Sequence, residues 1–261
     1  MNTPHSITYP LVLSSAALAY LLALLEVPQL LGVDDATLFP SDQAARDATF
    51  SAGKSYLESE GWLTWQADQH AYHLDEALLA IITSLAFPVV VMVVTLDTPP
   101  TPRRGVTCTI SNDLVIEVAR FEDTYHLNVL ASVDLLVQRL VHVLELPPQH
   151  GTVATYTLAR PTFEAIRRDP QNPVQLALPP TVAEHLITTL TTLTCSAVIA
   201  FLQVRQSQVT ALHLIGVLVG RADQAWMVQP AGEASVQLTA LGRDDLAASL
   251  LSNIVALQPA A

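Results

Sequence analysis

Residues 89–94 read VVVMVV, and residues 197–202, which begin 108 positions later, read AVIAFL. A strand that is apolar on both faces belongs inside a sheet, because it has no polar side to turn toward water. Around each run the sequence predicts the same order of elements: a helix, four strands and a closing helix. Two other pairs of corresponding points lie 110 and 111 residues apart. This order and spacing predict an internal duplication.

The elements of the first half can be placed from their hydrophobic periods. A helix is expected over residues 75–86 and a closing helix over 133–146, with strands over 89–94, 106–111, 114–120 and 125–130. In the second half, Thr181 and Glu184 form the Thr-x-x-Glu pattern of a helix start. Strands are expected there over 197–202, 211–219, 225–229 and 235–239, followed by a helix over 245–257.

The later strands alternate apolar and polar residues, and short connections join them. Both features favour antiparallel hairpins with helices on one face. We therefore predict an α+β fold with two pseudo-two-fold halves, each a helix, a four-stranded antiparallel sheet and a helix. The expected segments are 1–74, 75–150, a linker over 151–180 with a short helix at 163–168, and 181–261; residues 71–261 are expected to form one compact unit.

The first segment is expected to hold two helices and a small hairpin. The apolar run over residues 11–25 has no Lys or Arg before it and is shorter than a bilayer span. It is interpreted as a buried helix capped by Ser14 or Ser15, so no membrane insertion is expected. A second helix over 41–60, stopped by Gly61, precedes a hairpin of residues 62–65 and 71–74. This order resembles a winged helix.

Charge and cysteine content limit the classes of function. The 261 residues carry 24 acidic and 12 basic side chains, for a net charge of −12, and Lys54 is the only lysine. Nucleic-acid binding needs clustered Lys and Arg, so no nucleic-acid partner is expected. The isolated Cys108 and Cys195 are typical of a reducing compartment, which indicates a cytoplasmic protein.

Three patterns that suggest chemistry are each better explained by structure. Residues 48–55, ATFSAGKS, approach a phosphate-binding loop, but the residues before them are helical and no strand precedes them. His70 and His73 have no further ligands nearby in the sequence to complete a metal site. The paired carboxylates are those expected at turns and helix starts. We therefore expect no catalytic residue, no cofactor and no metal, and not an enzyme.

The connection between the first two strands of the first half is the candidate partner-binding site. Three prolines stiffen it, and two arginines give it positive charge on an acidic protein. Fixed backbone angles lower the cost of ordering a loop on binding. The residues are Thr98, Pro99, Pro100, Thr101, Pro102, Arg103 and Arg104.

Several short stretches resemble the EspG family of type VII (ESX) secretion-associated chaperones. They are LLEVP at 24–28, YLESEGWL at 56–63, LDEAL at 74–78, LAFP at 85–88, Gly220-Arg221 and QLT at 237–239 before the closing helix. The resemblance implies a cytosolic, non-enzymatic chaperone that binds a helical secreted heterodimer of PE and PPE type. It implies a binding surface around the central sheet, the 98–104 loop and the last helix. The Pro-rich loop and the lower Gly and Arg content depart from the family, so a WXG-type partner is an equal expectation.

Two other functions stay open at this level. The winged-helix-like start allows a regulatory or signalling protein, and an unrecognised hydrolase or nucleotide-binding enzyme would require a deep pocket with converging polar groups. The client's identity and the oligomeric state do not follow from the sequence.

Overall fold

A computed structural model describes residues 9–27, 30–31, 33, 38–101, 103–111, 114–146, 154–171, 176–206, 208–221 and 224–258. Its contacts divide the chain into two units. Unit 1 comprises residues 1–91, 106–132 and 204–208, and unit 2 comprises 92–105, 133–203 and 209–261. No helix in the described part of the chain is both long and apolar enough to cross a bilayer.

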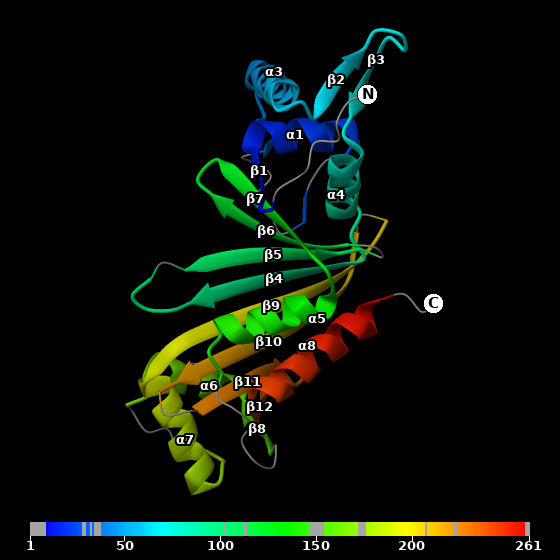
Figure 1. The fold of residues 1–261 in the computed structure, drawn as a ribbon. Helices are drawn as coiled ribbons and strands as arrows, with labels where there is room; N and C mark the ends of the chain where they lie inside the picture. Colours follow the sequence, from blue (N-terminus) through cyan, green and yellow to red (C-terminus); the bar gives the residue numbers. More distant parts are fainter. Residues whose placement is uncertain are drawn as a thin grey trace. The chain divides into compact units, whose positions relative to one another are not determined.

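Unit 1 combines helices with antiparallel strands (Figure 1). In chain order its elements are β1 (Leu11–Ser14), α1 (Ser15–Leu24), α3 (Gln43–Ser59), β2 (Leu63–Gln66), β3 (Ala71–Leu74), α4 (Glu76–Ala86), β5 (Arg104–Ile110), β6 (Val115–Phe121) and β7 (Thr124–Leu130). The strand order is β1-β7-β6-β5, and β2 pairs with β3 in a separate hairpin. The pairings β1–β7, β5–β6, β6–β7 and β2–β3 are antiparallel.

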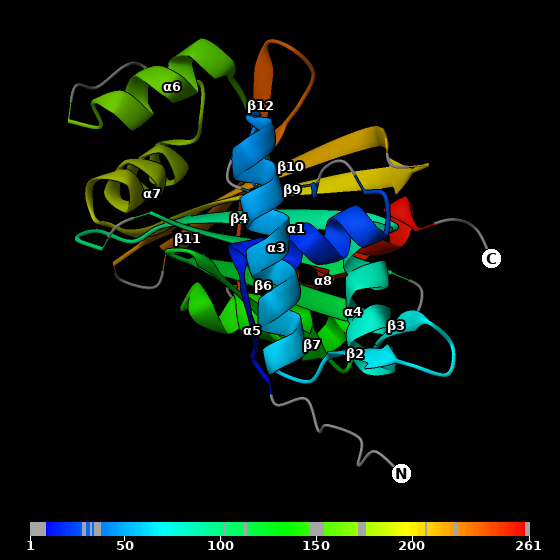
Figure 2. The same cartoon turned by 90° about the horizontal axis from the view of Figure 1, so that it is seen from above.

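Helix α1 forms the middle of the unit 1 core, and α3 crosses it (Figure 2). The crossing is close because Gly53 of α3 has no side chain: a Cβ there would lie 2.1 Å from the carbonyl oxygen of Ala16. Ser14 caps α1 by accepting a hydrogen bond from the amide of Ala17, as predicted. Asp42 caps α3, and Gly61 has the positive φ of 74° that the predicted stop requires.

Only part of the apolar run over residues 11–25 is the predicted helix. Leu11–Ser14, at its start, forms strand β1 and pairs with β7, and this strand was not expected. Leu11 and Leu13 face the core while Val12 is 37% exposed, which is the alternation of a half-buried strand. The run is apolar throughout, so its sequence does not mark the change from strand to helix.

Unit 2 holds β4 (Val90–Asp97) and most of the second half. Its further elements are α5 (Val133–Val143), β8 (Thr155–Ala159), α6 (Arg160–Arg168), α7 (Pro180–Thr191), β9 (Leu193–Arg205), β10 (Gln208–Gly220), β11 (Gln224–Pro230), β12 (Ser235–Ala240) and α8 (Arg243–Leu257). The strand order is β4-β9-β10-β11-β12-β8. The pairings β10–β11, β11–β12 and β12–β8 are antiparallel. Strand β9 lies between β4 and β10, so the prediction that this apolar strand lies inside the sheet is confirmed.

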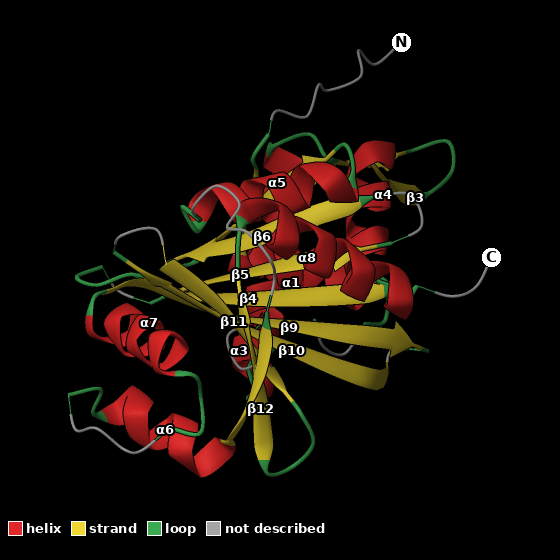
Figure 3. Ribbon diagram, turned by 90° about the horizontal axis from the view of Figure 1, so that it is seen from below, coloured by secondary structure: helices red, strands yellow, loops and turns green. Residues whose placement is uncertain are grey.

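Two helix pairs accompany these strands. Helices α5 and α8 lie side by side, and α6 and α7 form a separate pair (Figures 1 and 3). Phe163 and Ile166 of α6 and Leu186 of α7 pack in one apolar cluster with Leu218 of β10 and Trp226 of β11.

The order α-β-β-β-β-α occurs twice, as α4-β4-β5-β6-β7-α5 and as α7-β9-β10-β11-β12-α8. The α+β class and the antiparallel hairpins are confirmed. The duplication itself and the predicted segment boundaries stay predictions.

Two details of the second half were wrong. The 151–180 linker contains a strand, β8, as well as the expected helix, because residues 155–159 add to the edge of β12. Thr181 does not cap α7: the helix begins at Pro180, with Pro179 at the cap position. Proline is favoured in the first helical turn because its missing N–H would have no helical partner there.

Candidate polypeptide-binding surface

The predicted binding loop joins β4 to β5 and lies in unit 2. Thr98, Pro99, Pro100, Thr101, Arg103 and Arg104 are exposed, and Pro102 lies outside the described residues. The loop has a turn at its start, since the amide of Thr101 donates to the carbonyl of Thr98 at 2.8 Å. Because Arg103 and Arg104 are exposed, both are accessible to a partner.

The base of this loop contacts the inner strand of unit 2. The hydroxyl of Thr98 donates to Sγ of Cys195 on β9, at 3.6 Å. Burial raises the pKa of the Cys195 thiol, and this effect outweighs the opposite effect of the Thr98 hydrogen bond. The thiol is therefore protonated at neutral pH, which leaves it a poor nucleophile.

Apolar side chains are exposed on one face of β9 and β10. On β9 the amide of Gln203 donates to the carbonyl of Leu257 in α8, and on β10 the His213 ring contacts the Asn253 amide of α8. On β9 up to Gln203 and on β10 from Leu212 onward, odd-numbered residues therefore face α8 and even-numbered residues face the other way. Nearer the turn this alternation changes, because the hydroxyl of Thr210 donates to Oε1 of Gln203. Val198 is 45% exposed, Leu212 54% and Leu214 39%.

We call this area the open sheet face; it consists of Val198, Ala200, Leu202, Leu212 and Leu214. Further along β10, α6 and α7 cover the same side of the strand, where Leu218 is only 5% exposed. The open sheet face contains no ionisable side chain. Large contiguous apolar patches are typical of sites that interact with protein or membrane.

The sequence did not predict the open sheet face. Strand β10 was expected from its pattern, but the exposure of Leu212 and Leu214 depends on which elements cover the strand. The signal in the sequence was the absence of charge between Arg205 and Arg221. In an edge or exposed strand, charged residues would be expected to interrupt such a run.

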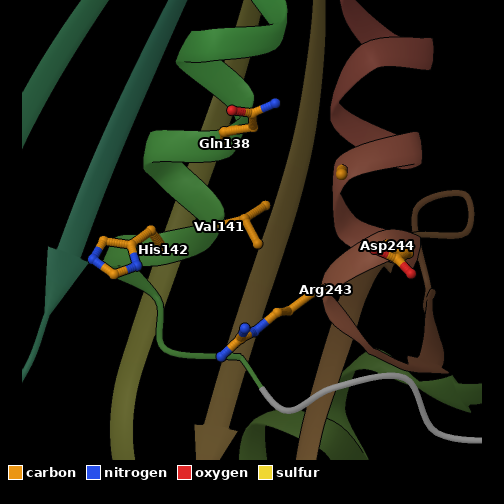
Figure 4. Close-up of a pocket in the computed structure, with 6 residues that line it drawn as sticks. Gln138, Val141, His142, Arg243 and Asp244 are labelled. Atoms are coloured by element: carbon orange, nitrogen blue, oxygen red, sulfur yellow. The ribbon is translucent and has the colours of Figure 1, made fainter.

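A small pocket lies between the end of α5 and the start of α8 (Figure 4). It has a volume of about 250 Å³ and is lined by Gln138, Val141, His142, Arg243, Asp244 and Ala247. Nε of Arg243 donates to the carbonyl of Leu146 at 2.7 Å, so part of this guanidinium serves to fix the chain after α5. The pocket is too small for a drug-sized ligand.

The motifs that sequence reasoning set aside occupy structural positions. Residues 48–55 lie within α3, and Gly53 provides the close crossing with α1. His70 and His73 are exposed on the β2–β3 hairpin. Among the residues that the structure describes, no three His, Cys, Asp or Glu side chains come together as a metal site would require.

The fold is the EspG-like fold of type VII secretion chaperones. The chain is similar to the chaperone EspG5 of Mycobacterium tuberculosis, solved in complex with a PE25–PPE41 dimer, with a TM-score of 0.65. The two chains share 12% sequence identity over 95% of this chain and 96% of the other. No protein-family model matches the sequence. No curated protein matches it either.

Proposed function

We propose that this chain is a protein-binding chaperone that holds a helical secreted client in the cytoplasm before export. The client would be a dimer of PE/PPE or WXG type, delivered to a type VII-like secretion system. The observation that carries the proposal is the open sheet face, an uncharged apolar area on a fold shared with a chaperone that binds such a dimer.

The chemistry of the surface suits an apolar polypeptide. Helical secreted proteins expose apolar side chains at three- and four-residue intervals, and a sheet face of Val and Leu gives them a surface of matching polarity. Burial of apolar area contributes about 25 cal/mol per Å² before the costs of association are subtracted. Binding of this kind needs no reaction centre.

The β4–β5 loop supplies the positive charge that the open sheet face lacks. Arg103 and Arg104 are exposed and positively charged, on a protein whose net charge is −12. We propose that they contact acidic side chains of the client and fix its orientation. Charge pairs at the rim of an interface act mainly on association rate and specificity.

The test is capture of purified client dimers by the immobilised full-length chain. The dimers are PE25–PPE41, further PE/PPE pairs and a WXG-type pair. We expect saturable binding of at least one dimer. Because charged groups on an apolar contact surface would lose water without gaining partners, we expect Leu212→Glu with Leu214→Glu to weaken it about a hundredfold.

Tyr72→Glu with Leu79→Glu is the matched control, because both side chains are also exposed, at 43% and 40%, but lie on β3 and α4. It should leave capture unchanged, and all variants should keep the circular dichroism spectrum of the parent. Binding of no dimer, or equal loss in the control variant, would refute the proposed function.

A further inference from the structure

Strand β10 is longer than the strand that pairs with it. The β10–β11 ladder covers Gly216–Gly220 on β10, opposite Gln224–Val228 on β11. Strand β11 ends at Pro230, where the chain turns to β12. This register places Leu214 opposite Pro230, so within the described part of the chain Gln208–His213 extends beyond β11. We call this stretch the β10 edge segment.

The backbone amides of this segment have a defined direction. The amide of Leu241 donates to Ala225, and the amide of Ala231 donates to Ser235, so odd-numbered residues of β11 bond toward β12. Even-numbered residues of β11 consequently bond toward β10, and their partners there include Gly216 and Leu218.

The same alternation continues into the edge segment. His213 faces α8 through Asn253, as Met227 does through Ser249 on the neighbouring strand, so no residue is inserted between the ladder and the segment. Leu212 and Leu214 therefore direct their N–H and C=O groups away from β9, and at Leu212 this side lies beyond the end of β11.

The edge segment lacks Lys and Pro, two of the features that normally protect an exposed edge. Proteins guard such edges with Lys, Pro, bulges or short strands. Here the sequence from Gln206 to Gly220 has no charged residue and no proline. Val209 and Leu212 are 46% and 54% exposed. By contrast, the edge strand β8 has five residues, and β1 has four.

We propose that the β10 edge segment accepts an extended, uncharged segment of the client as an additional antiparallel strand. The inference rests on the proposed function, because this strand would be a second contact of the same client beside the open sheet face. An uncharged strand matches the edge, since a charged one would bury its charge against Val and Leu without a partner. A second copy of the chain fits less well because it would bring another net charge of −12.

The test uses a fluorescent nine-residue peptide of alternating Thr and Val between terminal Gln residues, with acetyl and amide ends. Its binding to the purified full-length chain is followed by anisotropy. We expect saturable binding. Leu212→Pro removes an outward amide but no bond to β9, and should weaken binding about tenfold, the effect of losing one to two hydrogen bonds. Leu212→Thr keeps that amide and should bind within about threefold.

Two modified peptides test the inference on the parent chain. This experiment therefore does not depend on the folding of a variant. Methylating alternate amides of the peptide blocks one of its two hydrogen-bonding sides. Strand addition predicts that a peptide methylated on both sides does not bind, while a peptide methylated on one side only still binds through the other. Absence of binding by the plain peptide, or equal binding by the fully methylated one, would overturn the inference.

Two further results separate the possibilities. A dimer of the chain in sedimentation experiments that excess peptide does not dissociate would show that a second copy covers the edge, and would also overturn the inference. Capture of a helical dimer without peptide binding would leave the proposed function intact. Peptide binding without capture of any dimer would refute the proposed function and leave the edge as a strand-binding site.

Discussion

The connections β4–β5 and β9–β10 occupy the same place in the two α-β-β-β-β-α runs and are built differently. The arms of the first have eight and seven residues, and a proline-containing loop joins them. The arms of the second have 13 residues each, and only Gln206 and Ser207 separate them. The first places positive charge on a stiff loop, and the second exposes apolar strand. Two runs of the same element order thus offer a partner two different chemistries.

The largest effect on stability is expected from the glycines of the two hairpins. At Gly220 of β10 a Cβ would lie 2.8 Å from Cα of Thr189 in α7, whereas at Gly105 of β5 it would meet nothing within 4 Å. Gly220→Ala forces the helix backbone away from the sheet and should lower the free energy of unfolding by about 1–3 kcal/mol. Gly105→Ala should leave it unchanged or raise it by about 0.5 kcal/mol.

Urea denaturation of both variants measures this difference. A Gly220→Ala variant as stable as the parent would show that α7 does not pack as closely on β10 as described.

A smaller effect is expected from reversing the charge of the β4–β5 loop. Arg103→Glu with Arg104→Glu should weaken capture of a client dimer about three- to tenfold, mainly through a slower association rate. The loss should shrink as salt is raised. Surface plasmon resonance at two salt concentrations gives both rates.

Arg167→Glu with Arg168→Glu, at the end of α6, changes the net charge equally and serves as the control. The role proposed for the loop would be contradicted by equal losses in both double variants.

The smallest effect concerns the contact between this loop and β9. Because burial raises the pKa of Cys195 above its ordinary value of 9.0, alkylation of this thiol should be slow at neutral pH and should rise through and beyond pH 9. The Thr98 hydrogen bond lowers the pKa, so Thr98→Val should move the profile to still higher pH. The rate of alkylation by iodoacetamide, measured as a function of pH in a Cys108→Ala background, gives this profile. A profile unchanged by Thr98→Val would mean that the loop does not contact Cys195 in solution.

Much of the fold could be predicted because local signals agreed with tertiary structure. Helix α3 has a capping Asp42 and a stop at Gly61, and the β2–β3 hairpin has apolar strands around a polar turn. Strand β1 was missed because its pairing with β7 joins residues more than 100 positions apart, while its own sequence continues into a helix. Strand β8 was missed for a similar reason, since its partner β12 lies 80 residues further along.

The candidate site also has one part that the sequence predicted and one part that it did not. The loop could be predicted because prolines and arginines act through their own backbone and charge. The open sheet face could not, because Leu212 and Leu218 are both leucines on the same side of one strand. One is 54% exposed and the other 5%, and the difference depends on where α6 and α7 end.

The open sheet face also has a consequence for the chain before it meets a partner. Exposed apolar surface promotes self-association of the chain, and a net charge of −12 opposes this self-association by electrostatic repulsion. This repulsion extends only about 8 Å at physiological ionic strength and about 3 Å at 1 M salt. Concentrated salt should therefore make the unliganded chain associate with itself and scatter light, while a chain with its apolar surface occupied should stay dispersed.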